Sequence, residues 1–421
     1  MGAIPPVKGT RDFYPEAMAI RTWLYDRVRQ VSQSFGYVEY EPPYLERLEL
    51  YAAKSGEELV KEQAYVFPDR GGDLIALRPE LTPGLARMVA SRASELPRPI
   101  RWWSFGPIWR YERPQKGRSR EFFQWNLDLM GPESAEADAE VAAVAVELFR
   151  AVGLAPDRIQ LLVNNRRLAE SKCLALGVVP DQMPAALRLI DRRDKLEAGA
   201  WRAFGLELGL DPKSLDGIQE LLGDDQGWRD SSELRSFFEA VEALGAADYM
   251  KFDPTVVRGL DYYTGTVFEA RDTDGRFRAI LGGGRYDNLV ADVGGDRIPA
   301  VGFAMGDVTI GLMIQQAGTA PAGPPPPASA LVCWVDEQAR LEALRLAADV
   351  RRAGVPVEWY PSAERLPRQL KYADRQRIAL ALIVGSRELE QGAVTIKDLR
   401  DGSQQTIARD GVIARLTAML E

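Results

Sequence analysis

The chain of 421 residues contains no histidine. This absence excludes Ser-His-Asp and Cys-His catalytic groups, imidazole general bases and nearly all zinc sites, because these depend on an imidazole. Any chemistry would have to use arginine, lysine, carboxylates, tyrosine, amides and hard metal ions. Such groups suit phosphoryl or nucleotidyl transfer, in which positioning and charge neutralisation supply most of the catalysis.

Cysteine is almost as scarce, and long apolar runs are missing. Cys173 and Cys333 are the only two cysteines, and their wide separation allows neither a disulfide framework nor a Cys-x-x-Cys metal site. We expect both to be buried free thiols. There is no run of about 18 apolar residues and no signal-peptide pattern. We therefore expect a cytoplasmic protein with no membrane span.

The net charge of −8, from 53 basic and 61 acidic residues, argues against a general nucleic-acid binder. Residues 101–120 are a local exception, with six basic residues, interleaved aromatics and the single acid Glu112. Two interpretations of this segment remain open. It is either a hairpin that binds phosphates or nucleic acid, or a solvated charged hairpin with no ligand.

The length suggests two or three domains. Apolar residues at helical spacing predict helices over residues 20–35 and 135–152, each followed by a glycine suited to a left-handed C-cap. Strand patterns cover residues 37–43, 74–77, 100–105, 122–130, 267–269 and 300–305. Strands outnumber helices, so we expect an α+β domain with an antiparallel sheet flanked by helices.

Three further segments define the expected domain organisation. Residues 167–245 are mostly helical and polar in pattern, which indicates an insertion within a first domain of residues 1–320. The proline-rich stretch 321–330 predicts a semi-rigid linker. Beyond it, alternating strand and helix patterns over residues 331–421 predict a small α/β domain.

The usual nucleotide-binding signatures are missing. There is no G-x-x-x-x-G-K-[ST] sequence, and no G-x-G-x-x-G joins a strand to a helix. If ATP binds, it binds in another way. Residues 105–124 predict a strand, a basic loop and a returning strand, which would offer guanidinium groups for phosphate oxygens and an aromatic face for a base.

This hairpin resembles motif 2 of class II aminoacyl-tRNA synthetases, in the form found in histidyl-tRNA synthetases. Further segments match that family in the same order along the chain: residues 8–12 (Lys-Gly-Thr-Arg-Asp), 77–82 (Leu-Arg-Pro-Glu-Leu-Thr), 189–191 (Leu-Ile-Asp), 258–265 (Arg-Gly-Leu-Asp-Tyr-Tyr-Thr-Gly) and 282–287 (Gly-Gly-Gly-Arg-Tyr-Asp). The resemblance therefore covers nearly the whole chain. Residues 258–265 are the most specific match, because they belong to the histidyl branch.

The resemblance implies a class II catalytic domain with an antiparallel sheet and a helical insertion, followed by an anticodon-binding domain. It implies ATP-dependent ligation of L-histidine to tRNA(His) through a histidyl-adenylate, with Mg²⁺ accompanying ATP. It also implies a homodimer formed through the motif 1 region, and we expect the apolar face of the first helix to be exposed for it.

Residue roles follow from the same resemblance. Arg110 and Arg258 are the expected catalytic cations, on either side of the α-phosphorus. The expected ATP-binding residues are Arg110, Glu112, Arg118 and Phe122. The expected histidine-binding residues are Glu80, Thr82 and Gln124 at the α-amino group, with Asp128, Arg258, Tyr263 and Tyr286. Because Tyr262 and Tyr263 are adjacent on a predicted strand, we expect one of them to face away from the pocket.

Three departures from the family pattern bear on function. Residues 307–309 are Asp-Val-Thr where the family usually has Leu-Glu-Arg, so an arginine that contacts ATP is replaced by Thr309. Arg113 or Arg118 could supply the missing charge. Asp128 stands where glutamate is common, and Phe123 stands where histidine is frequent.

The lost arginine keeps one alternative open. A non-catalytic paralogue, the regulatory subunit of ATP phosphoribosyltransferase, retains this core to sense histidine. The intact motif 2 and the resemblance of residues 331–421 to an anticodon-binding domain favour the ligase.

Overall fold

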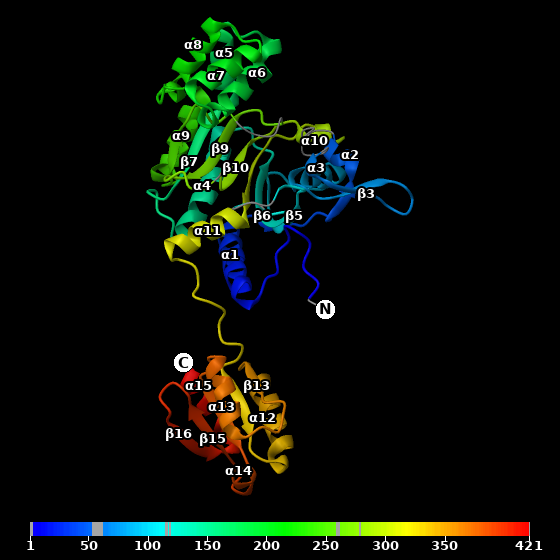
Figure 1. Cartoon of the computed structure of the whole chain (residues 1–421), viewed down its shortest axis with the longest axis vertical. Helices are drawn as coiled ribbons and strands as arrows, with labels where there is room; N and C mark the ends of the chain where they lie inside the picture. Colours follow the sequence, from blue (N-terminus) through cyan, green and yellow to red (C-terminus); the bar gives the residue numbers. More distant parts are fainter. Residues whose placement is uncertain are drawn as a thin grey trace. The chain divides into compact units, whose positions relative to one another are not determined.

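The computed structural model describes residues 3–52, 62–113, 117, 119–257, 262–277 and 279–420. By the contacts within it, the chain divides into two compact units, Met1–Gly323 and Pro324–Glu421 (Figure 1). The division falls inside the proline-rich stretch.

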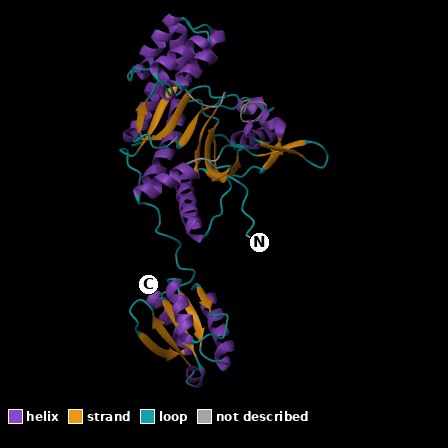
Figure 2. Cartoon of the chain, viewed as in Figure 1, coloured by secondary structure: helices purple, strands orange, loops and turns teal. Residues whose placement is uncertain are grey.

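An eight-stranded sheet forms the centre of the first unit, in the order β1-β5-β6-β11-β10-β9-β7-β8 (Figure 2). The strands are β1 (Val38–Glu39), β5 (Ile100–Trp109), β6 (Glu121–Met130), β7 (Ile159–Asn165), β8 (Met250–Phe252), β9 (Thr266–Asp272), β10 (Leu281–Arg285) and β11 (Ala300–Gly306). All inner pairs are antiparallel, whereas β1 with β5 and β7 with β8 are parallel. The predicted α+β fold is confirmed, with a mixed rather than wholly antiparallel sheet.

Helices cover one face of this sheet. They are α1 (Pro15–Ser34), α4 (Ala135–Ala151), α9 (Ser232–Ala243) and α11 (Asp307–Ala317). Leu24 and Val28 of α1 are buried in the same apolar cluster as Val141 and Val144 of α4. The expectation that the apolar face of the first helix is exposed is therefore wrong, because α4 packs against it.

The strand predicted over residues 37–43 is much shorter, since only Val38 and Glu39 pair with β5. Pro42 and Pro43 have no backbone N–H to donate to a ladder. The chain then enters a separate three-stranded sheet, β2-β4-β3. Its elements are β2 (Leu45–Arg47), β3 (Tyr65–Pro68) and β4 (Leu74–Leu77), with α2 (Leu48–Ala52) after β2 and α3 (Thr82–Ser91) after β4.

Residues 166–221 form a cluster of four helices, α5 (Arg166–Ala175), α6 (Met183–Asp191), α7 (Ala198–Glu207) and α8 (Pro212–Leu221). Leu189, Trp201 and Leu215 form part of its own apolar core. By contrast, Phe237 of α9 is buried in the core of the large sheet. We therefore propose that the inserted subdomain consists of α5 to α8, and that α9 belongs to the core of the large sheet.

The second unit is a five-stranded sheet in the order β13-β12-β14-β15-β16. Its strands are β12 (Ala330–Trp334), β13 (Val357–Trp359), β14 (Leu380–Val384), β15 (Ala393–Asp398) and β16 (Gln404–Ala408), and its helices are α12 (Arg340–Arg352), α13 (Leu366–Arg375), α14 (Ser386–Glu390) and α15 (Val412–Leu420). β12 is buried along its whole length, as its apolar sequence requires. Among the described residues, no helix is both long and apolar enough to cross a membrane.

Candidate active site

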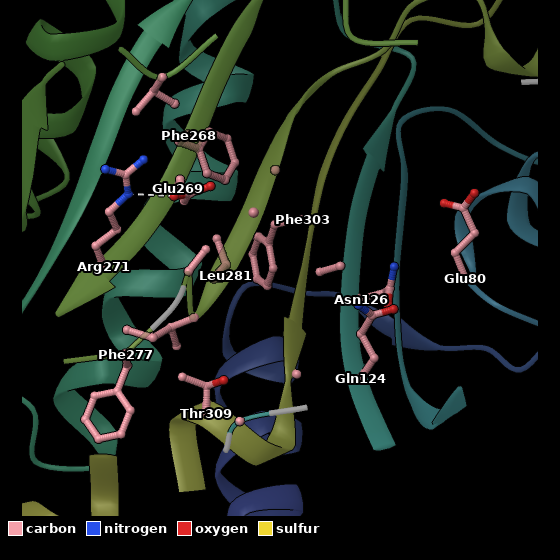
Figure 3. Close-up of a pocket in the computed structure, with 18 of the residues that line it drawn as sticks. Glu80, Gln124, Asn126, Phe268, Glu269, Arg271, Phe277, Leu281, Phe303 and Thr309 are labelled. Atoms are coloured by element: carbon pink, nitrogen blue, oxygen red, sulfur yellow. Dashed lines mark hydrogen bonds and ion pairs between the residues drawn. The ribbon is translucent and has the colours of Figure 1, made fainter. Parts of the chain in front are cut away.

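The hairpin of β5 and β6 presents alternate side chains to opposite faces of the sheet. Trp125, Leu127 and Leu129 are buried in the apolar cluster under the helices. Gln124, Asn126 and Asp128 line a cavity of about 1070 Å³ on the other face. Figure 3 shows Gln124 and Asn126 on this strand and Glu80 on a separate segment to its right.

Nine of the eleven predicted site residues line this single cavity: Glu80, Thr82, Arg110, Glu112, Phe122, Gln124, Asp128, Tyr263 and Tyr286. Arg118 and Arg258 lie outside the described residues. The nine come from segments more than 200 residues apart in the sequence. The fold therefore brings together residues that belong to separate motifs along the sequence.

One end of the cavity is a buried acid and tyrosine pair. The hydroxyl of Tyr286 donates to Asp128 Oδ1 at 2.5 Å, and both residues are 2% exposed. Burial raises the pKa of Asp128 to about 7, although the hydrogen bond from Tyr286 opposes that rise. Asp128 Oδ2 has no hydrogen-bond partner within the described residues. It is thus available to a ligand donor.

Gly302 makes room for this carboxylate. A Cβ atom built at Gly302 of β11 would lie 2.0 Å from Asp128 Oδ1. Residue 302 faces Asp128 directly across the antiparallel pair of β6 and β11. Any larger residue there would displace the acid, so the glycine is a requirement of the site.

A buried ion-pair network holds the backbone on either side of Tyr286. Arg285, 4% exposed, lies 2.6 Å from Asp138 and 3.2 Å from Asp287. Thr264 Oγ1 donates to Asp287 Oδ2 at 2.8 Å. The network therefore joins the residues on either side of Tyr286 to the turn that carries Tyr263, and holds both tyrosines in place.

The expectation for Tyr262 and Tyr263 is wrong, because both line the cavity. They precede β9 and do not lie in a strand. Strand alternation therefore does not apply to them. Their rings meet edge to face, with centroids 5.0 Å apart.

Arg110 stands at the other end, where β5 leaves the sheet. Its Nε donates to the carbonyl of Pro79 at 2.8 Å, and its guanidinium lies 5.5 Å from the ring centroid of Phe122. The loop that bears Glu80 thus orients the arginine. Phe122 lines the cavity, whereas Phe123 does not.

Thr309 also lines the cavity, in the first turn of α11. The cations that line it within the described part of the chain are Arg110, Lys195 and Arg271. Arg113, a candidate to replace the motif 3 arginine, does not line it. Arg271 lies 2.6 Å from Glu269 and 2.9 Å from Asp194.

Sequence reasoning did not identify Asn126, Glu269 or Arg271 as cavity residues. Asn126 lies between Gln124 and Asp128 at the two-residue period of a strand, so alternation alone could have found it. Glu269 and Arg271 have the same spacing on β9, and Figure 3 shows them joined as an ion pair. No pattern in the sequence predicts that Asp194 of the helical insertion contacts Arg271 at this cavity.

The structure has a mixed sheet whose open face holds arginine, carboxylates and a motif 2 hairpin, and a small α/β unit follows it in the sequence. This combination is typical of class II aminoacyl-tRNA synthetases. The sequence profile described as histidyl-tRNA synthetase matches residues 9–308, and that described as anticodon binding domain matches residues 329–419. The chain belongs to the histidyl-tRNA synthetase family.

Individual relatives agree with this assignment. The histidine–tRNA ligase of Haloarcula marismortui is 39% identical over 416 residues, which is 95% of each chain. The crystal structure of histidyl-tRNA synthetase from Nostoc sp. PCC 7120 has a TM-score of 0.82 at 24% identity and covers 100% of both chains.

A second solved structure, called an ATP phosphoribosyltransferase regulatory subunit/histidyl-tRNA synthetase from Bacillus halodurans, has a TM-score of 0.74 at 22% identity and covers 91% of this chain and 98% of its own. The fold alone therefore does not separate ligase from regulatory subunit. The sequence relatives do, and they favour the ligase.

Proposed function

We propose that this enzyme joins L-histidine to tRNA(His) in two steps at the cavity described above. The histidine carboxylate first attacks the α-phosphorus of ATP and releases pyrophosphate. A terminal ribose hydroxyl of the tRNA then attacks the adenylate and releases AMP. The observation that carries the proposal is the convergence of nine motif residues on one cavity, in a chain of this family.

The buried end of the cavity suits the imidazole. Ionised Asp128 can accept a hydrogen bond from a ring N–H through Oδ2, while Tyr286 holds Oδ1. Glu80, Thr82 and Gln124 suit the α-ammonium group. An amino acid without a donor at that position would leave the buried carboxylate unpaired, and this penalty is the source of selectivity.

The opposite end suits the nucleotide. Arg110 is oriented by Pro79 and can neutralise charge that develops on the α-phosphate as the carboxylate attacks. The ring of Phe122 offers a stacking face for adenine. By the family pattern, Arg258 and Arg118 add further positive charge, and Glu112 frames the base. Charge stabilisation, rather than proton transfer, is the main device of this site.

Magnesium would enter with ATP. Glu112 and Glu269 line the cavity and are the oxygen donors that Mg²⁺ prefers. Within the described ranges, no group of three or more Asp, Glu, His or Cys residues is placed to hold a metal. The phosphates and water would therefore supply most ligands, and the ion's contribution is to neutralise phosphate charge.

The second unit supplies a surface for the tRNA. On and beside α13, five basic residues are exposed: Arg365, Arg368, Lys371, Arg375 and Arg377. Two acids, Glu364 and Asp374, stand among them, and Glu364 pairs with Arg368 at 2.9 Å. The excess of positive charge suits a phosphate backbone, in a segment that matches the anticodon binding domain.

We also propose a homodimer. Large apolar side chains are exposed along the segment from β1 to β4, with Val38 63% and Leu74 52% exposed. β1 is an edge strand of the large sheet and is open to further pairing. Sedimentation equilibrium would show a dimer that Val38→Asp weakens. A wild-type monomer would refute this proposal.

We propose a cytoplasmic location as well, because the proposed tRNA substrate suits that compartment.

The decisive experiment is ATP–pyrophosphate exchange with each of the twenty amino acids, followed by aminoacylation of a tRNA(His) transcript. Exchange with histidine alone, then charging of the transcript, is the expected result. Histidine binding without exchange would instead favour the regulatory alternative. Exchange with another amino acid would refute the assignment of the imidazole pocket.

A further inference from the structure

The segment of residues 9–13, here called the N-terminal strap, lies against the returning strand of the motif 2 hairpin. The carbonyl of Gly9 accepts from the backbone N–H of Arg120 at 2.8 Å and from Ser119 Oγ at 2.7 Å. Gly9 has a φ of +89°, and a Cβ there would lie 2.7 Å from Arg120 Cγ. The close approach therefore requires glycine.

A single carboxylate, that of Asp307, joins the strap to β6 and α11. Arg11 Nη2 lies 2.9 Å from Asp307 Oδ2, and Asp307 Oδ1 accepts from the backbone N–H of Phe123 at 2.8 Å. Asp307 is the first residue of α11 and is 8% exposed. The strap, β6 and α11 thus meet at one buried acid.

The ring of Phe123 is held from several sides. The guanidinium of Arg21 lies 4.0 Å from its centroid, and the rings of Phe13 and Phe105 lie 6.0 Å away. A cation over an aromatic face is favourable, and more so when partly desolvated. Because Phe123 is fixed on one face of β6, its neighbour Phe122 is directed to the other face, into the cavity.

The charge of Asp307 also needs a partner. Burial raises its pKa, while Arg11 and the Phe123 N–H lower it. A buried carboxylate without its cation is strongly unfavourable and would also repel the phosphates of ATP. Both Arg11 and Arg21 act on this acid, so the strap and α1 supply the compensating charge.

We propose that Arg11 and Asp307 are positioning residues for ATP. Their ion pair fixes Phe122 through β6 and Thr309 through the first turn of α11, and both of these line the nucleotide end of the cavity. The inference rests on the proposed function, which assigns that end to ATP. Asp307 is itself one of the three residues that depart from the family's motif 3.

The test is steady-state ATP–pyrophosphate exchange on the full chain, with ATP and histidine varied separately. Arg11→Ala should raise KM for ATP about tenfold, the equivalent of about 1.4 kcal/mol, and leave KM for histidine within about twofold. Asp307→Asn should act in the same direction but less, since its amide oxygen can still accept from Phe123. Arg11→Lys should restore most of the affinity, because it restores the charge.

The double variant Arg11→Ala with Asp307→Asn should be no worse than Arg11→Ala alone, because the two residues act as one unit. Arg92→Ala is the matched control. Arg92 forms an exposed ion pair with Glu95 at 2.8 Å in the same unit and does not line the cavity. It should leave both KM values unchanged.

Three results would overturn the inference: equal rises in both KM values, a fall in kcat alone, or no change. If Arg11→Ala does not fold, Asp307→Asn and Arg11→Lys decide the question. If the wild-type chain shows no exchange, the proposed catalysis fails, and calorimetric titration of the same variants with ATP tests the positioning role separately. A wild-type chain that binds no ATP would overturn the inference as well.

Discussion

The two ends of the cavity are built differently. At the end that we propose binds histidine, polar groups are deeply buried and short contacts hold them, as between Asp128 of β6 and Tyr286, which directly follows β10. At the end that we propose binds the nucleotide, Arg110 and Phe122 lie at the edge of the sheet, and distant segments hold them, including the N-terminal strap. Under the proposed function, we therefore expect selectivity to depend on the buried pocket. We expect nucleotide binding to depend on how the surrounding segments assemble, so that a changed motif 3 can be compensated by other residues.

The largest effect is expected at the buried end. Asp128→Ala should reduce kcat/KM for histidine by about 100-fold or more, because the imidazole N–H would be left without its acceptor. KM for ATP should stay within about twofold. Pyrophosphate exchange measures both values. A similar loss for both substrates would show that the two ends do not act independently.

At the nucleotide end, Phe122→Ala should raise KM for ATP by about tenfold, since stacking of a base on an aromatic ring contributes about 1–3 kcal/mol. The histidine value should change little. Phe122→Trp keeps an aromatic face and should retain most of the affinity. If the Ala and Trp variants behave alike, stacking is not the role of this residue.

Tyr286→Phe should have an intermediate effect, with KM for histidine raised about two- to tenfold by the loss of one hydrogen bond. Because that hydrogen bond lowers the pKa of Asp128, its loss should raise the pKa further above about 7. The ionised acceptor would then appear only at higher pH. KM for histidine, measured from pH 6 to 9, should decrease as the pH rises, and this decrease should occur at a higher pH in the variant than in the wild type. An unshifted profile would show that Tyr286 does not control the pKa of Asp128.

The buried Asp128 should also affect how the stability of the folded protein depends on pH. The pKa of Asp128 is about 7 in the folded protein, against an ordinary value of 3.8. Its stabilising contribution is therefore present below about pH 4 and is lost as the pH rises through 7. Asp128→Asn should melt a few degrees above the wild type at pH 8 and no higher at pH 4. Calorimetry at the two pH values would test this, and a constant difference would contradict it.

The smallest effect is expected for Arg113→Ala. Arg113 does not line the cavity, so KM for ATP should change by less than about twofold. A larger rise would mean that Arg113 replaces the motif 3 arginine after all. Arg118→Ala, run beside it, tests the other candidate.

Particular residues show how far prediction from sequence could go. Motif matches found Arg110, Phe122, Gln124 and Asp128, and the structure brings these to one cavity. Alternation along β6 could also have found Asn126. The sequence predicts a strand at Tyr262, but the structure has a turn there, so strand alternation gives the wrong orientation for this residue. Arg271 and Asp194 meet from β9 and the helical insertion, and no local pattern predicts such a contact.

The sequence by itself determined the family, the order of motifs and the fold class, because strand and helix periodicity and short motifs are local properties of a chain. It also determined that catalysis proceeds without histidine side chains. Only the tertiary structure decided which acid is buried, which face of α1 is covered, and that Arg11 reaches Asp307 across 296 residues. Burial and ion pairing depend on contacts between distant segments, and those contacts exist only once the sheet and its helices have packed together.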